Sequence, residues 1–174
     1  MAVLEAVKKN RGEEPLKRSD IKYTISMVVL DIVAPILLML GLKFSPAANA
    51  SLLNNFEIVA TAVIALAVFG EAVGKRLWAA IALIMLSSIL LSLDTAEGFS
   101  FSFGSLLVLG ATICWGIENN CTRQIADKDP LQIVMVKGLG SGLGALMVAW
   151  AIGERLVGAE WMIATMFLAL WLMD

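Results

Sequence analysis

The sequence predicts an all-α membrane protein, a multi-pass helical bundle of about six transmembrane helices. Apolar residues make up 59% of its 174 residues, above the roughly 45–50% that is typical of soluble domains. The mean hydropathy is +0.84. The apolar residues gather in uncharged stretches, most clearly 77–93 and 98–117, and about 20 such residues cross the core of a bilayer. The charged residues gather instead in the amino-terminal segment and the short connections.

Proline and polar residues separate the predicted helices. Pro46 and Pro130 each suit the first turn of a helix, where the missing N–H is not needed. Asp129, directly before Pro130, is a predicted N-cap. Residues 94–102 contain Gly98 with alternating Phe and Ser, a pattern that predicts a loop with interfacial aromatic rings. The predicted helices are 21–42, 46–70, 77–93, 103–125, 130–152 and 156–173.

Lysine and arginine are divided unequally between the two ends of these helices. Ten of the 13 lie on the side of the amino-terminal segment, two lie on the opposite side, and Lys137 falls within a helix. Cytoplasmic connections carry the excess of Lys and Arg in membrane proteins. The bias therefore predicts a protein of the cell (plasma) membrane in which residues 1–20 form a basic cytoplasmic tail and 94–102 an extracytoplasmic loop.

The composition also argues against several functional classes. The net charge of −2 indicates no nucleic-acid partner, and histidine, the commonest metal ligand, is absent. Cys114 and Cys121 lie two helical turns apart and form no metal motif, so we expect no metal and no cofactor. No arrangement of nucleophile and base indicates an enzyme.

Two carboxylates are expected near the middle of the membrane. Asp31 and Glu57 lie on consecutive helices, equally far along the chain from Phe44 in the connection between them. They should therefore meet at one depth, where two neighbouring carboxylates cannot both ionise easily. The pair would then bind a proton. Alternatively, each acid is neutral and hydrogen-bonded within a helix interface.

Glu118 and Lys137 show the same relation around the turn at 127–128. They should meet about two turns inside the membrane and form an ion pair, because a buried charge without a partner is strongly destabilising. The pair is either structural or part of a cavity wall.

Two predicted helices have a polar face. Asn54, Glu57 and Thr61 follow helical spacing on one helix, and Trp115 and Glu118 do so on another. A polar face cannot be turned toward lipid, so it lines either a helix interface or a water-filled pathway. The run 137–144 holds two overlapping small-xxx-small pairs, Gly138/Gly142 and Gly140/Gly144, which predict tight helix packing.

These motifs, in this order, resemble the EamA domain, the repeat unit of the drug/metabolite transporter superfamily. The first part of the resemblance is the stretch 48–57, Ala-Asn-Ala-Ser-Leu-Leu-Asn-Asn-Phe-Glu, followed by Gly70-Glu71 and a helix with Trp78. A second copy of the repeat is similar to the chain at residues 104–107, Cys114-Trp115-Gly116, Thr122-Arg123 and Asp129-Pro130. One departure is Ile58, where the family commonly has a proline that follows the acidic residue and kinks the helix.

The resemblance implies a domain organisation. Complete family members have ten helices in two inverted repeats, with both termini in the cytoplasm. By motif, residues 21–93 correspond to the rear three helices of the first repeat and residues 103–174 to the front three of the second. The six helices then resemble the third to the eighth of ten, and the chain is expected to be truncated.

The resemblance further implies a permease for small metabolites or drugs, with the lipid bilayer and a small-molecule substrate as partners. The cavity residues expected from the polar faces are Asn54, Glu57, Thr61, Trp115 and Glu118, with Asp31 and Lys137 as supporting charges. The alternative is a membrane protein that does not transport. It would act through helix–helix assembly, as a homo-oligomer or with complementing helices.

Overall fold

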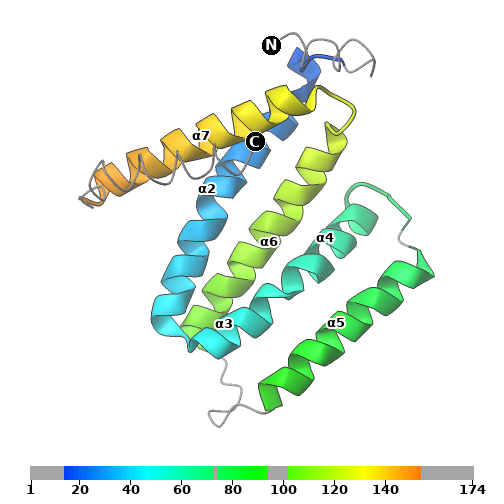
Figure 1. The fold of residues 1–174 in the computed structure, drawn as a ribbon, viewed down its shortest axis with the longest axis vertical. Helices are drawn as coiled ribbons and strands as arrows, with labels where there is room; N and C mark the ends of the chain where they lie inside the picture. Colours follow the sequence, from blue (N-terminus) through cyan, green and yellow to red (C-terminus); the bar gives the residue numbers. More distant parts are fainter. Residues whose placement is uncertain (1–13, 73, 94–101, 154–174) are drawn as a thin grey trace, which may run out of the picture.

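The computed structural model describes residues 14–72, 74–93 and 102–153, with the backbone alone for 88–93. The described chain is built from helices joined by short connections (Figure 1). Their bounds are η1 Arg18–Asp20, α2 Ile21–Phe44, α3 Ala47–Asn54, α4 Phe56–Ala67, α5 Lys75–Leu93, α6 Phe103–Gln124 and α7 Pro130–Ala151. The predicted helices that begin at 21, 77, 103 and 130 are confirmed within two residues at each end. The one predicted for 156–173 lies outside the described residues.

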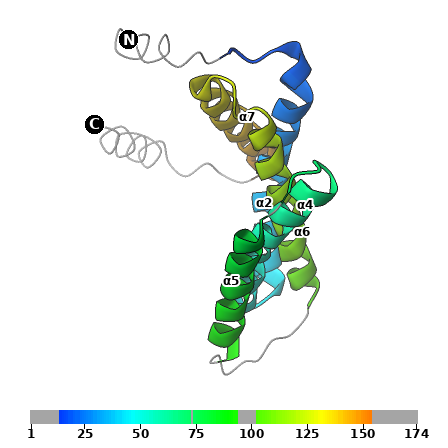
Figure 2. The same cartoon turned by 90° about the vertical axis from the view of Figure 1, so that its right-hand side faces the viewer.

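Helix α6 is the centre of the described fold. It packs against α2 on one side and against α3 and α4 on another, while α7 packs on α2 and α5 on α3 and α4. Figure 1 shows α7 steeply inclined across α2, and Figure 2 shows α5 and α7 toward opposite ends of the molecule. Helices α2 and α4 do not pack against each other.

The helix predicted for 46–70 is divided in two, which corrects the sequence-based prediction. Residue Asn55 separates α3 from α4, and its N–H donates to the carbonyl of Leu52, three residues back. Asparagine competes for backbone hydrogen bonds and has low helix propensity, so two in succession favour such a tightened turn. The helix breaks although Ile58 stands where a proline is common in the family that the sequence resembles. The helical segment also ends earlier than predicted, at Ala67.

Glycines allow the backbones around α6 to approach closely. A Cβ atom on Gly104 of α6 would lie 2.6 Å from the carbonyl oxygen of Gly41 on α2. A Cβ atom on Gly116 would lie 2.9 Å from Cβ of Ala60 on α4. Both distances are shorter than van der Waals contact, so α6 requires glycine where it crosses each of these neighbours.

The glycines of α7 divide into two sets. Hypothetical Cβ atoms on Gly140 and Gly144 would collide with the side chains of Val28 and Ile32 on α2, which confirms tight packing at this pair. A methyl group added at Gly138 or Gly142 would have no described atom within 4 Å. One face of α7 therefore packs on α2, and the other is open in the part of the chain that the structure describes.

Three segments of the described chain are long and apolar enough to cross a membrane: Arg18–Phe44, Ala47–Ala67 and Pro130–Ala151. The second of them contains the break at Asn55. Together with the helical fold, these segments support a multi-pass all-α membrane protein. A total of six spans and the division at 94–102 into two repeats stay predictions.

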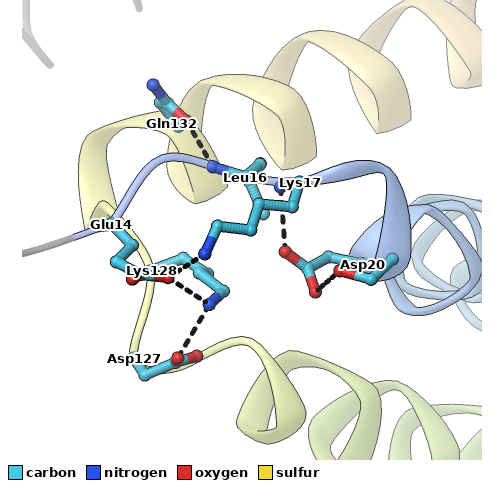
Figure 3. A network of polar contacts seen from close by, with 8 residues as sticks. Glu14, Leu16, Lys17, Asp20, Asp127, Lys128 and Gln132 are labelled. Atoms are coloured by element: carbon cyan, nitrogen blue, oxygen red, sulfur yellow. Dashed lines mark hydrogen bonds and ion pairs between the residues drawn. The ribbon is translucent and has the colours of Figure 1, made fainter.

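The basic connections meet at one end of the bundle. Lys128, in the connection between α6 and α7, lies 3.3 Å from a carboxylate oxygen of Glu14 and 2.8 Å from one of Asp127 (Figure 3). The N–H of Asp129 donates to the carbonyl of Glu14 at 2.9 Å. Lys17 and then Lys128 lower the pKa of the Glu14 carboxyl through hydrogen bonds. The segment before α2 is thus fixed to the connection between α6 and α7.

The connection between α4 and α5 lies at this same end, because Glu71 pairs with Arg123 near the end of α6 at 2.6 Å. At the opposite end, the rings of Phe44 and Phe103 pack edge to face with centroids 6.1 Å apart. The structure therefore groups three of the basic connections as the distribution of Lys and Arg predicts. Which side of the membrane they occupy stays a prediction.

Gly104→Ala should destabilise the fold by about 1–3 kcal/mol, because the new methyl group meets backbone atoms that cannot rotate away. The matched control is Gly142→Ala, which adds the same group to a helix where no described atom lies within 4 Å. The control should unfold at the same temperature as the unchanged protein, or higher, since alanine favours helix. Thermal unfolding in detergent, followed by circular dichroism, measures both. Equal stability of the two variants would contradict the close crossing.

Candidate transport pocket and charge cluster

Helix α6 carries polar side chains in two directions, because successive residues turn by about 100° around a helix. Asn119 and Arg123, four residues apart, contact residues of α4 and of the connection after it. Glu118, one residue before Asn119, contacts Lys137 of α7 instead. Two groups of polar residues therefore form on different faces of one helix.

The first group lines an open pocket of about 350 Å³ between α4, α5 and α6. Asn119 donates to Oε1 of Glu57 at 2.9 Å and to Oγ1 of Thr61 at 3.3 Å. A carboxylate, a hydroxyl and an amide thus converge within the pocket. Apolar side chains complete its walls: Ile58, Ala62, Ala65, Ala72, Leu77 and Ile81.

An ion pair forms part of the pocket wall near the end of the bundle. Arg123 lies 2.6 Å from Oε2 of Glu71, and Gln124 donates to Oε1 of the same carboxylate at 3.4 Å. Both Arg123 and Glu71 line the pocket. They connect the end of α6 to the segment that leads into α5.

A buried amide holds α6 against α4 behind the pocket. Asn120 is 1% exposed, and its Nδ2 donates to the carbonyl of Thr61 at 3.0 Å and to that of Gly116 at 2.7 Å. A side-chain amide buried between membrane helices destabilises the fold unless its hydrogen bonds are made to protein. Asn120 therefore fixes the position of Thr61 relative to Asn119.

The second group is a charge cluster formed by Asp31, Glu118 and Lys137. Lys137 Nζ lies 3.0 Å from Oε1 of Glu118 and 3.8 Å from Oδ1 of Asp31. The Thr122 hydroxyl donates to the same oxygen of Glu118 at 2.6 Å. The predicted pair of Glu118 and Lys137 is confirmed, and α2 contributes a second carboxylate to it.

The predicted pair of Asp31 and Glu57 is wrong. Asp31 is on α2 and Glu57 is on α4, and these helices do not pack against each other because α6 lies between them. Equal depth places two residues at one level of the membrane but does not make their helices neighbours. Each acid takes a different partner, Lys137 or Asn119.

The other predicted cavity residues lie apart from the pocket wall. Asn54 is at the end of α3, and its buried Oδ1 has no hydrogen-bond partner among the described residues. Trp115 is half-buried on α6. Of the seven predicted residues, Glu57 and Thr61 line the pocket, while Asp31, Glu118 and Lys137 form the charge cluster.

Sequence reasoning missed Asn119, Arg123 and Glu71 as pocket residues. A signal for Asn119 was present, because Glu118-Asn119-Asn120 is a run of three polar residues within a predicted span. Such a run cannot all face one side of a helix, so it implies two polar surfaces. In the part of the chain that the structure describes, no group of three or more His, Cys, Asp or Glu side chains is placed to hold a metal ion.

Comparison with known proteins identifies the family. The family model of the EamA-like transporter family matches residues 2–93, which is more than half of the chain. This chain belongs to the EamA-like transporter family. Asn119 and Arg123 lie beyond the segment that the family model matches, so the EamA segment supplies Glu57 and Thr61 to the pocket and α6 supplies Asn119 and Arg123.

A curated relative extends the similarity across both sides of the pocket. An uncharacterized transporter of Methanothermobacter thermautotrophicus is 27% identical over 154 residues, which cover 84% of this chain and 44% of the relative. This EamA-family chain thus spans less than half the length of that relative. No solved structure matches this chain. Family membership and the apolar helices support a multi-pass membrane protein, and the relative is itself named as a transporter.

Lys137→Met should destabilise the protein by about 3–5 kcal/mol near neutral pH, because it leaves the buried Glu118 carboxylate without its cation. The loss should shrink as the pH falls, since protonation removes the uncompensated charge. The double variant Lys137→Met/Glu118→Leu should recover most of the stability. Denaturant unfolding in detergent measures all three proteins, and a stable single variant would contradict a structural pair.

Proposed function

We propose that this chain is part of an EamA-type permease that moves small metabolites or drugs across the cell membrane. The observation that supports this best is the pocket of about 350 Å³ between α4, α5 and α6. Helix α4 belongs to one of the three described segments of membrane-spanning length, Ala47–Ala67. The volume of the pocket lies within the range of about 300–1,000 Å³ that is typical of small-molecule sites. A few polar groups converge among apolar walls, which is also the usual composition of such sites.

The polar groups of the pocket can exchange partners with a substrate. The amide of Asn119 is shared between Glu57 and Thr61, at 2.9 and 3.3 Å. A substrate amine or hydroxyl that donates to Glu57 would replace Asn119 there without leaving the carboxylate unpaired. The freed amide nitrogen of Asn119 would then donate to an acceptor on the substrate.

Glu57 is the residue that we propose takes part in proton or substrate coupling. Its carboxylate lies in a pocket with apolar walls and accepts a hydrogen bond from a neutral amide. An ionised acid at such a position is costly, and binding either a proton or a cationic substrate group relieves that cost. Binding of one would therefore oppose binding of the other.

Further helices complete the carrier in this proposal. The chain spans 44% of its curated relative, and α7 of the described fold packs on α2 along one face only. The amino terminus is proposed to be cytoplasmic, because the basic connections gather at its end of the bundle.

A second candidate is a membrane protein that assembles with other helices and does not transport. The open glycines Gly138 and Gly142 favour it, since small residues allow another helix to approach closely. This candidate predicts a discrete oligomer in detergent and no flux.

The transport proposal is tested in proteoliposomes with a panel of small amines, amino acids and organic cations. The unchanged protein should move at least one of them in a pH-dependent manner. Glu57→Gln should reduce that flux at least ~10-fold and abolish its pH dependence, because the amide can neither ionise nor exchange a proton. Asp127→Asn, at a carboxylate in the connection between α6 and α7, is the control and should transport normally.

Two outcomes would contradict the proposal in different ways. Unchanged pH-dependent flux in Glu57→Gln would remove Glu57 from coupling while leaving transport intact. A discrete oligomer of the unchanged protein without flux for any compound would favour the assembly candidate.

A further inference from the structure

We propose that Asp31 holds a proton within the membrane and makes the charge cluster a proton-binding site separate from the pocket. The cluster contains two carboxylates, on Asp31 and Glu118, and one ammonium group, on Lys137. With all three ionised, it would carry one uncompensated negative charge among membrane helices. An unpaired charge in that position is expensive, and one bound proton removes it.

The geometry assigns the proton to Asp31 and not to Glu118. Glu118 has a side chain that is 3% exposed and receives two donors on one oxygen, Lys137 at 3.0 Å and Thr122 at 2.6 Å. Both donors stabilise its anion. Asp31 lies 3.8 Å from Lys137, which is within ion-pair distance but beyond hydrogen-bond distance, so its anion has the attraction of the ammonium charge without a hydrogen bond from it.

Asp31 is also the more accessible of the two acids. Its side chain is 23% exposed, against 3% for Glu118. The side chain of Lys137 is 34% exposed, so the cluster is open on the side of Asp31 and Lys137, and Glu118 is its buried member. In this proposal the pair of Glu118 and Lys137 stays ionised, and Asp31 is the acid that exchanges its proton.

The described surroundings of Asp31 offer no other charge that would neutralise it. From α6 and α7 the facing ionisable groups are Glu118 and Lys137, with the thiol of Cys121 one turn along α6. Helix α3 has no ionisable residue. Asp20, just before α2, lies about 16 Å from Asp31 along the helix axis. A metal ion does not fit, since no described group of three or more suitable ligands exists.

This inference does not depend on which substrate the pocket takes, or on transport. It concerns α2, α6 and α7, whereas the pocket is formed by α4, α5 and α6. The test is therefore a direct measurement of protonation.

Infrared difference spectroscopy of the full chain in liposomes, titrated from acid to alkaline pH, measures protonation of the carboxyl groups directly. We expect a carbonyl band of a protonated carboxylic acid that survives to neutral pH. The band should shift when aspartate is labelled with ¹³C at its carboxyl group, and it should be absent from Asp31→Asn. Glu57→Gln is the matched control at the acid of the pocket, outside the charge cluster, and should keep the aspartate band.

A second variant tests whether the net charge of the cluster determines how many protons it binds. Lys137→Gln removes the ammonium group, so both carboxylates should take up a proton, and a second acid band should appear that shifts with glutamate labelling. Asp31→Asn leaves a neutral pair and should fold at least as stably as the unchanged protein, as circular dichroism can check.

Several results would overturn the proposal. An aspartate acid band that is missing at neutral pH, or that persists in Asp31→Asn, would contradict the assignment. A band that shifts only with glutamate labelling would place the proton on Glu118 or Glu57. Displacement of the band by sodium at constant pH would show that the cluster is not selective for the proton.

Discussion

Helix α6, which the sequence predicts to lie within the membrane, carries Glu118, Asn119 and Asn120, and these polar side chains cannot be turned toward lipid. The bilayer core offers no water to satisfy them, so their hydrogen bonds must be made to protein. Helix α6 meets this requirement because it packs against α2, α3 and α4 and because Lys137 of α7 reaches Glu118, so each of the three residues has a partner. The arrangement of the other described helices follows from covering α6.

The position of α6 between α2 and α4 separates the charge cluster from the pocket. Glycines at both crossings bring α2 and α4 close enough for short side chains to reach α6. The carboxylate of Asp31 consequently pairs with Lys137 of α7, while that of Glu57 accepts from Asn119 of α6. Helix α6 thus contributes Glu118 to the charge cluster and Asn119 to the pocket.

Hydropathy, proline and capping rules were sufficient to predict most helix positions, and the N-cap Asp129 before Pro130 is confirmed. Equal sequence separation from a turn correctly paired Glu118 with Lys137, because the long lysine side chain reaches from α7 to α6 at that depth. The same rule failed for Asp31 and Glu57, since depth does not specify which helices are neighbours. The break at Asn55 depends on a local hydrogen bond, and the role of Asn119 depends on contacts with a helix 62 residues earlier in the chain; helical periodicity specifies neither.

Cysteine cross-linking in membranes tests the central position of α6 most directly. In a background with Cys114 and Cys121 replaced by serine, two double variants should cross-link readily with a short thiol-reactive reagent: Leu37→Cys with Gly110→Cys, and Thr61→Cys with Asn119→Cys. The first pair joins α2 to α6, where a Cβ atom on Gly110 would lie 3.5 Å from Leu37, and the second joins α4 to α6, where Asn119 donates to Thr61 at 3.3 Å. Asp31→Cys with Glu57→Cys should not cross-link, since α6 lies between α2 and α4. Efficient cross-linking of the last pair, with none in the first two, would contradict the central position of α6.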